Sequence, residues 1–199
     1  TRFDNVRVPK ANVIGGRPGL GFKNAMETLD YARPGVAAQA VGAAQGALDY
    51  SLAYAARRRQ FGNSINSFQM VQQMLADMAM KTEAARCLVH SVASMVDNGR
   101  AAEAGKKAAM AKCFATDVAM EVATDAVQIF GGYGFMEDYP VAKFFRDAKI
   151  LQIYEGTNQI QRMVVARALI KETGNLGHLA AYIPQEEQQS FCEIEAKVQ

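Results

Sequence analysis

The stretch AAEAGKKAAMAKCFATDVAMEVATDAVQIF, residues 101–130, decides the fold class of this chain. Its larger apolar residues recur at helical spacing: Met110, Phe114, Val118, Met120, Val122, Val127 and Ile129. Alanines fill many of the remaining positions, and such small side chains allow neighbouring helices to approach closely. Gly131 and Gly132 follow directly and stop the pattern. The stretch therefore predicts one long helix of a close-packed bundle.

Further helical patterns lie on both sides of this stretch. One runs over residues 21–59, where Pro34 should kink the helix or divide it. A second runs over residues 68–96. A short amphipathic helix at residues 141–148 is followed by a final helix that ends near Gly174. Together these patterns predict an all-α fold, an antiparallel four-helix bundle.

The two ends of the chain differ from the bundle. Apolar and polar residues alternate from Phe3 to Val8, which is typical of a strand, and a strand needs partners that the rest of the chain does not offer. We therefore expect residues 1–14 to end a sheet that is otherwise missing, and the chain to be a C-terminal piece of a longer protein. The bundle is expected over residues 15–175, and residues 176–199 form either an extra helix or a disordered end.

Composition excludes several classes of function. Half of the 199 residues are hydrophobic, and the net charge of +2 is too small to indicate binding to nucleic acid or to a membrane surface. No apolar run approaches the length of a membrane span. The cysteines Cys87, Cys113 and Cys192 form no CxxC pair and no metal spacing with His90 or His178. We expect no metal site, and reduced, buried thiols that suit a bacterial cytoplasm or a mitochondrial matrix.

A single acidic residue stands out in ILQIYEGTNQI, residues 150–160. Glu155 lies between an apolar run and a Gly-Thr-Asn turn, after which Thr157 or Asn158 can cap the final helix. If Ile153 and Tyr154 wall the carboxylate, the lost hydration raises its pKa toward the range of a general base. The alternative is an ordinary acidic residue near a helix N-terminus. The glycine after Glu155 would let backbone approach a ligand closely.

Three other segments each allow two interpretations. Arg57–Arg59 is either a cationic helix end or a fork donor for a phosphate, and it leads into a turn at Phe61–Ser64. The glycines of residues 128–134 either cap a helix or lie directly against a flat or phosphorylated ligand. Asp30 and Arg33 stand three apart, so a surface ion pair is the simpler interpretation.

The order of these segments closely resembles the C-terminal half of acyl-CoA dehydrogenases, from Phe3 to about Ile170. The motifs that carry the resemblance are Leu29-Asp30-x-x-Arg33, Arg58-x-Gln60-Phe61-Gly62, Phe68-Gln69, Gln128-Ile129-x-Gly131-Gly132-x-Gly134, Arg146-Asp147-Ala148 and Ile153-Tyr154-Glu155-Gly156-Thr157-Asn158-Gln159-Ile160-Gln161-Arg162.

The resemblance implies a particular architecture and cofactor. Residues 1–14 would be the last strand of a truncated middle β-domain, and the bundle would hold FAD together with a neighbouring subunit. The positions that match FAD contacts of the family are Arg58, Gln60, Phe61, Phe68, Gln69, Gln128, Ile129, Phe130, Gly131, Gly132, Thr157, Asn158 and Gln159. Among these, Arg58 would contact the pyrophosphate, and residues 128–132 would line the adenosine of FAD bound mainly by the neighbouring subunit.

The resemblance also implies the reaction. Glu155 would remove the α-proton of an acyl-CoA thioester while a hydride passes from the β-carbon to flavin N5. Gly156 would touch the substrate, and Asp30 and Arg33 match positions near bound acyl-CoA. Some branches of the family place the base on the first bundle helix, but Tyr31 and its neighbour Ala32 carry no carboxylate here, which favours Glu155 over its remote rival Asp30.

The family further implies a homo-oligomer, either a dimer or a tetramer, and an electron-transfer flavoprotein as the electron acceptor. Two alternatives stay open. The protein is an acyl-CoA oxidase that reacts with oxygen, or the chain is an isolated C-terminal domain that acts only in oligomer assembly and FAD binding. The sequence leaves the acyl group of the substrate open.

Overall fold

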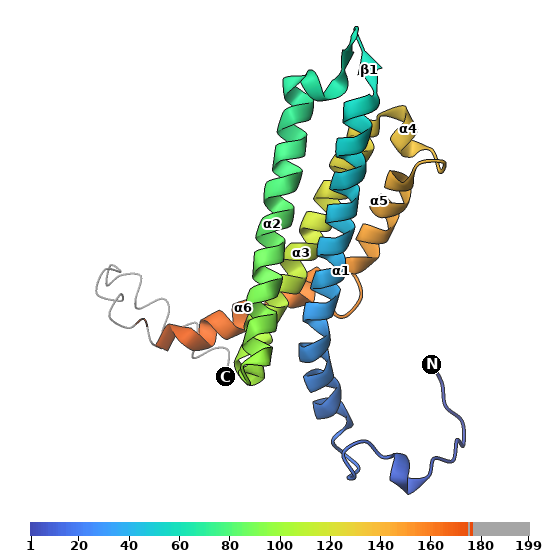
Figure 1. The fold of residues 1–199 in the computed structure, drawn as a ribbon. Coiled ribbons are helices and arrows are strands. Elements are labelled where there is room, and N and C mark those ends of the chain that lie inside the picture. The colour runs from blue at the N-terminus through green and yellow to red at the C-terminus, as the bar shows by residue number, and fades with distance from the viewer. Residues whose placement is uncertain (175, 177–199) are drawn as a thin grey trace, which may run out of the picture.

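The structure, a computed structural model, describes residues 1–174 and 176. Three long helices run side by side along the molecule (Figure 1): α1 (Gly21–Arg57), α2 (Gln69–Asp97) and α3 (Ala101–Phe130). The shorter α5 (Pro140–Leu151) runs back along α1 and α3, so that the chain passes up, down, up and down. The prediction of an all-α antiparallel bundle is confirmed.

The remaining elements are short, except for one helix that crosses the bundle. α6 (Asn158–Glu172) contacts α3 and points away from the lower end of the bundle in Figure 1. The short elements are η1 (Lys10–Asn12), β1 (Arg59–Gln60), β2 (Asn63–Ser64), η2 (Ile65–Ser67) and α4 (Gly132–Phe135). Within the described residues, no helix is both long enough and apolar enough to pass through a membrane.

Alanine-rich faces bring the two central helices together. Buried alanines recur along α1 from Ala37 to Ala55 and along α3 from Ala104 to Ala126, and these two helices share the largest contact in the molecule. Larger side chains from the other helices complete the core, including the fully buried Met78 of α2 and Val141 of α5. Close approach of helices through small residues fixes the position of every side chain on α3 relative to α1.

Proline does not divide the first helix. Of the two predicted effects of Pro34, a kink or a division near Arg33, the division is wrong, because α1 continues through Pro34; the kink stays a prediction. A proline removes one backbone hydrogen bond, but the helix on either side is held by buried residues, among them Arg33, Val36 and Ala37. Tertiary packing therefore outweighs the local preference of this position.

The predicted turn between α1 and α2 is confirmed as a two-residue hairpin. Arg59 pairs with Ser64 and Gln60 with Asn63 in an antiparallel register. Phe61 and Gly62 occupy the turn with φ values of 51° and 82°, and such positive values at both central residues are typical of a type I′ turn.

The N-terminal segment forms no strand in the structure. Phe3 and Val8 are exposed, and the backbone around them pairs with no other described segment. A strand needs hydrogen-bonding partners for its backbone, so the assignment of residues 1–14 to a β-domain stays a prediction. The tail predicted over residues 176–199 lies outside the described residues, apart from Leu176.

The prediction of buried thiols is confirmed at Cys113 and wrong at Cys87, which is exposed. The buried positions of α2 follow a helical stripe through Met78, Thr82 and Ala85, and Cys87 lies off that stripe. Cys192 lies outside the described residues.

Candidate active site

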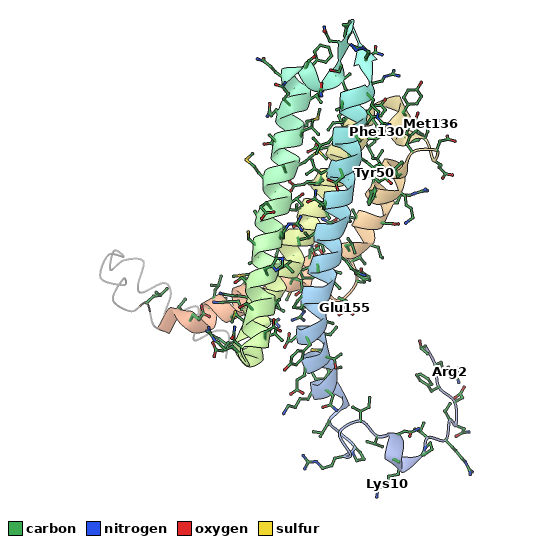
Figure 2. All side chains as sticks on the ribbon, viewed as in Figure 1. Arg2, Lys10, Tyr50, Phe130, Met136 and Glu155 are labelled. Atoms are coloured by element: carbon green, nitrogen blue, oxygen red, sulfur yellow. The ribbon has the colours of Figure 1, made fainter. Side chains whose placement is uncertain are left out.

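The loop between α5 and α6 carries Glu155 against the bundle, and Figure 2 shows this residue beside the lower half of α1. The hydroxyl group of Tyr154 donates to Oε1 of Gln39 on α1 over 2.7 Å. Glu155 itself has a φ of 56°, and Gly156 has a φ of 88°. Two consecutive left-handed residues make a tight turn, and the non-glycine residue among them is strained, which is a feature of functional sites.

The carboxyl group of Glu155 is partly withdrawn from water. Its Oε2 atom is buried and has no hydrogen-bond partner within the described chain. Ile153 and Tyr154, the walls considered from the sequence, are themselves 49% and 37% exposed, so any cover that they give the carboxyl group is partial. Tyr154 nevertheless lies close to the carboxyl group: its hydroxyl bonds to Gln39 on α1, and burial, with the charge of Glu155 as the smaller cause, raises the pKa of Tyr154. An unpartnered carboxyl oxygen in a protected place can accept a proton from a bound molecule.

Two buried side chains hold the backbone of this turn. Nζ of Lys112 donates to the carbonyl oxygen of Gly156 and to Oδ1 of Asn158, each over 2.9 Å. Nε2 of Gln161 donates to the carbonyl oxygens of both Glu155 and Gly156 over 3.1 Å. Lys112 and Gln161 are fully buried. Burial lowers the pKa of Lys112, while the carboxylates of Asp117 and Glu155 act in the opposite direction.

The first residue of α6 is locked into the bundle. Thr157 caps the helix by accepting from the backbone N–H of Ile160, which confirms the capping prediction. Asn158 is buried, and its amide nitrogen donates to Oγ1 of Thr116 over 2.8 Å and to Oδ1 of Asp117 over 2.7 Å. Because these partners and Lys112 occupy its amide group, the geometry does not favour Asn158 as a cofactor contact. Gln159 is exposed beside it.

Asp30 and Arg33 form an ion pair, but it is not the surface pair of the simpler interpretation. Arg33 is only 7% exposed, and one of its terminal nitrogens lies 2.5 Å from Oδ1 of Asp30. Its Nε has no partner within the described chain. Arg33 is close enough to Lys112 to lower the pKa of that lysine. Two buried cationic groups therefore lie near the Glu155 turn, where they favour an anionic or strongly polar ligand.

A second group of predicted residues gathers at the opposite end of the bundle. A groove of about 500 Å³ is lined by Tyr54, Arg58, Gln60, Ile65, Ile129, Phe130, Gly131, Gly132, Tyr133 and Met136. The guanidinium of Arg58 lies 5.1 Å from the centre of the Tyr133 ring. Gly131 and Gly132 have open space where a side chain would be. A cation, aromatic faces and bare backbone suit a flat ligand that carries phosphate.

Aromatic packing shapes the floor of this groove. Tyr54 stacks on Phe130 with ring centroids 4.0 Å apart and an angle of 16° between the ring planes. Burial raises the pKa of the Tyr54 hydroxyl, and the positive charge of Arg58 partly offsets that effect. Phe61 and Phe68 meet edge to face at 6.2 Å on the hairpin side of the same end. Gln69 and Gln128 are exposed nearby on the helix termini.

The two groups of predicted residues are far apart within one chain. Figure 2 shows Glu155 toward the lower end of the bundle and Phe130 toward the upper end. Lys112, which bonds the Glu155 turn, and Phe130 lie on the same helix, and at 1.5 Å per residue they are separated by about 27 Å. One small ligand in one copy of the chain does not bridge this distance unless it is fully extended.

Sequence reasoning missed Lys112, Tyr54 and Tyr133 as site residues, and it quoted Gln161 within a motif without giving it a role. Lys112 had a detectable signal, because it lies on the alanine-rich face of α3 between Ala108 and Ala115. A lysine on a buried stripe must find partners, since an unpaired buried ammonium is costly.

Comparison with known proteins shows the family of the chain. Residues 19–170 match a family described as "Acyl-CoA dehydrogenase, C-terminal domain". The chain is 60% identical over 169 residues to probable acyl-CoA dehydrogenase FadE25 of Mycobacterium tuberculosis (strain ATCC 25618 / H37Rv), covering 85% of this chain and 43% of that protein. It is 48% identical over 170 residues to caffeyl-CoA reductase-Etf complex subunit CarC of Acetobacterium woodii, covering 85% of this chain and 44% of that subunit.

A solved structure gives the same result for the fold. Butyryl-CoA dehydrogenase from Megasphaera elsdenii superposes with a TM-score of 0.76 at 54% identity, covering 78% of this chain and 40% of that chain. The chain thus spans about two-fifths of the length of the relatives that it matches. On the family match and these identities, the chain belongs to the acyl-CoA dehydrogenase family, within its C-terminal domain.

Proposed function

We propose that this chain serves in the flavin-dependent α,β-dehydrogenation of an acyl-CoA thioester, with Glu155 as the base that removes the α-proton. The observation that carries the proposal is the buried, unpartnered Oε2 of Glu155 on its strained turn. In a dry, positioned site a carboxylate needs no reorganisation before it accepts a proton. The names of the relatives support acyl-CoA as the class of substrate.

The residues around Glu155 divide the work of binding. Gly156 follows the base directly, so a thioester that reaches the Glu155 carboxylate lies beside the backbone of this turn, while Gln161 fills the space of the missing Gly156 side chain. The buried guanidinium of Arg33, held by Asp30, is a donor for polar groups of the acyl-CoA. Because an ordinary α-C–H is too weak an acid for a carboxylate, the α-proton becomes removable only when the thioester carbonyl is polarised in the site.

The groove at the other end of the bundle fits part of FAD. Gly131 and Gly132 leave their backbone open to a ligand, and Arg58 provides a cation for a pyrophosphate. When bound, FAD supplies the acceptor for the hydride that leaves the β-carbon. Tyr133, which is 45% exposed, then presents an aromatic ring on which a base can stack.

The separation of the two groups supports a homo-oligomer, a dimer or a tetramer. The groove lies about 27 Å along α3 from the Glu155 turn, so we assign the groove of one copy to the flavin used by Glu155 of its neighbour. Exposed apolar side chains on α6, among them Ile160, Met163 and Ile170, provide surface for such assembly.

Electrons leave to an electron-transfer flavoprotein in this proposal. The name of the CarC relative, a subunit of a complex with Etf, supports such a partner. An oxidase would instead be reoxidised by oxygen. In the full-length protein, acyl-CoA should reduce the flavin rapidly without air, and air should reoxidise the flavin slowly. Rapid reoxidation by air would favour the oxidase.

The decisive test uses the flavin colour of the full-length protein. Short, medium, branched and aromatic acyl-CoA thioesters are added without air, and loss of visible flavin absorbance is followed. Glu155→Gln should slow this bleaching by about 10²–10⁴-fold, the usual contribution of a general base. Glu27→Gln, an exposed carboxylate on α1, is the matched control. A coloured wild type that no thioester bleaches would leave oligomer assembly as the function.

A further inference from the structure

We infer that Lys112 is a positioning residue for Glu155: its ammonium holds the Glu155–Gly156 turn to the centre of α3 and thereby orients the Glu155 carboxylate. The inference rests on the proposed function, since it takes Glu155 as the base. Lys112 itself need not touch the substrate. It acts through the carbonyl group of Gly156, the residue after the base.

The surroundings of Lys112 are unusual for a lysine. The side chain is 0% exposed and lies on α3, the helix that contacts α1, α2, α5 and α6. Within the described residues no carboxylate comes within ion-pair distance of its Nζ. Its two acceptors are instead a backbone carbonyl, at Gly156, and an amide oxygen, at Asn158. A buried ammonium without a direct carboxylate partner is costly, so the protein carries this group at the expense of stability.

Both acceptors belong to the segment that carries the base. Gly156 directly follows Glu155, and Asn158 is the first residue of α6. The Lys112 ammonium therefore fixes two points on either side of Thr157, and it ties the loop and the helix start to one atom on α3. Since α3 is the helix most deeply packed in the bundle, its side chains are well suited to define the position of a loop.

The turn depends on such support because its backbone is strained. Glu155 and Gly156 have φ values of 56° and 88°, and a glutamate does not adopt a left-handed conformation without compensation. Two donors converge on the carbonyl oxygen of Gly156, namely Nζ of Lys112 and Nε2 of Gln161. Gln161 also holds the carbonyl of Glu155. The carbonyl groups of Glu155 and Gly156, the two left-handed residues of this turn, are thus both held by buried side chains.

A small displacement of this turn would move the carboxylate away from the α-carbon of the substrate. A misplacement of about 1 Å in a catalytic group can cost about 10²-fold in rate. Removing the ammonium should therefore lower turnover far more than substrate affinity, because Arg33, the proposed donor to acyl-CoA, lies on α1 and is held by Asp30 rather than by the turn. A merely structural lysine would change thermal stability without this selective effect on turnover.

The experiment compares Lys112→Met with Lys107→Met in the full-length protein. Both changes replace a lysine of α3, and Lys107 is exposed. Two readouts are used: kcat and KM with the best acyl-CoA of the panel, and hydrogen exchange of the peptide over residues 152–160. We expect Lys112→Met to lower kcat by about 10- to 100-fold with KM within about threefold, and to accelerate exchange in that peptide. Lys107→Met should change neither.

The two readouts separate the possible failures. If none of the acyl-CoA thioesters bleaches the flavin of the wild type, the proposed function fails. Faster hydrogen exchange over residues 152–160 in Lys112→Met would then still support the role of Lys112 at the turn. Unchanged kcat together with unchanged exchange in Lys112→Met would overturn the inference. If Lys112→Met does not fold, the same two measurements are made on Lys112→Gln. The glutamine side chain is shorter than that of lysine, so its amide cannot reach both acceptors. Wild-type kcat and exchange in Lys112→Gln would also overturn the inference.

Discussion

The α-carbon of Gly156 faces the side-chain amide of Gln161 so closely that a β-carbon built on it would lie 2.6 Å from Nε2. That amide is not free to move, because it donates to the carbonyl oxygens of Glu155 and Gly156. Gly156 is therefore required for two separate reasons: its φ of 88° and the space that Gln161 fills.

Gly156→Ala should destabilise the protein by about 2–4 kcal/mol, the sum of a left-handed alanine and an overpacked contact. Gly62→Ala is the matched control, because Gly62 has a φ of 82° but open space around it. The control should cost only about 1 kcal/mol. Urea unfolding followed by circular dichroism measures both. Equal losses of unfolding free energy in the two variants would show that the Gln161 side chain moves aside without destabilising the protein.

A second glycine pair separates packing from ligand contact. A β-carbon on Gly134 would lie 2.5 Å from the carbonyl oxygen of Val127, and backbone cannot yield as a side chain can. Gly134→Ala should therefore lower the free energy of unfolding by about 1–3 kcal/mol. Gly132→Ala has open space and should change it by about 0.5 kcal/mol or less. If Gly132 lies against FAD, its variant should nevertheless bind FAD more weakly in a fluorescence titration; unchanged affinity would remove Gly132 from the cofactor site.

The role assigned to Arg58 can be tested against its neighbour. Arg58→Leu should weaken FAD binding by about 10- to 100-fold, because a charge-assisted hydrogen bond to phosphate contributes about 1.5–3 kcal/mol. Arg57→Leu changes the same type of residue at an exposed position and should leave the affinity within about twofold. Titration of the flavin-free, full-length protein gives both values. A larger loss in Arg57→Leu would place the pyrophosphate elsewhere.

Asp125 gives a prediction about pH. Burial raises the pKa of this carboxyl, with Asp77 and Glu121 adding to the effect and Lys81 opposing it. A folded-state pKa above the unfolded one means that the folded state binds the proton more tightly, so this contribution to stability is present at low pH and is lost as the pH rises through the folded value. Asp125→Asn should therefore be more stable than wild type at pH 7, with the difference shrinking toward about pH 4.

Urea unfolding at several pH values measures this difference, with the exposed Asp138→Asn as the control. A gain in the Asp125 variant that does not depend on pH would show that its burial does not act through ionisation.

The helices could be predicted from sequence because their signals are local. The apolar spacing of residues 101–130 and the glycine after Phe130 define α3 without reference to other segments. The continuity of α1 through Pro34 could not be predicted in this way, since it depends on packing against α3.

The site was predictable only where one residue type carries the chemistry. Glu155 stood out because it is a single carboxylate in an apolar segment, and Thr157 was recognisable as a cap. The support from Lys112 was not recognisable, because it comes from a residue 44 positions away from Gly156. Likewise, the exposure of Ile153 depends on the direction in which a left-handed turn projects its neighbours.

The most direct test of the account is exchange of the α-proton in an acyl-CoA whose β-carbon carries no hydrogen, so that proton removal is observed without oxidation. The full-length protein should exchange this proton with deuterium from the solvent, and Glu155→Gln should slow the exchange by about 10²–10⁴-fold. Exchange in Glu155→Gln at the wild-type rate, or loss of exchange in Asp30→Asn with Glu155→Gln unaffected, would contradict the assignment of Glu155 as the base.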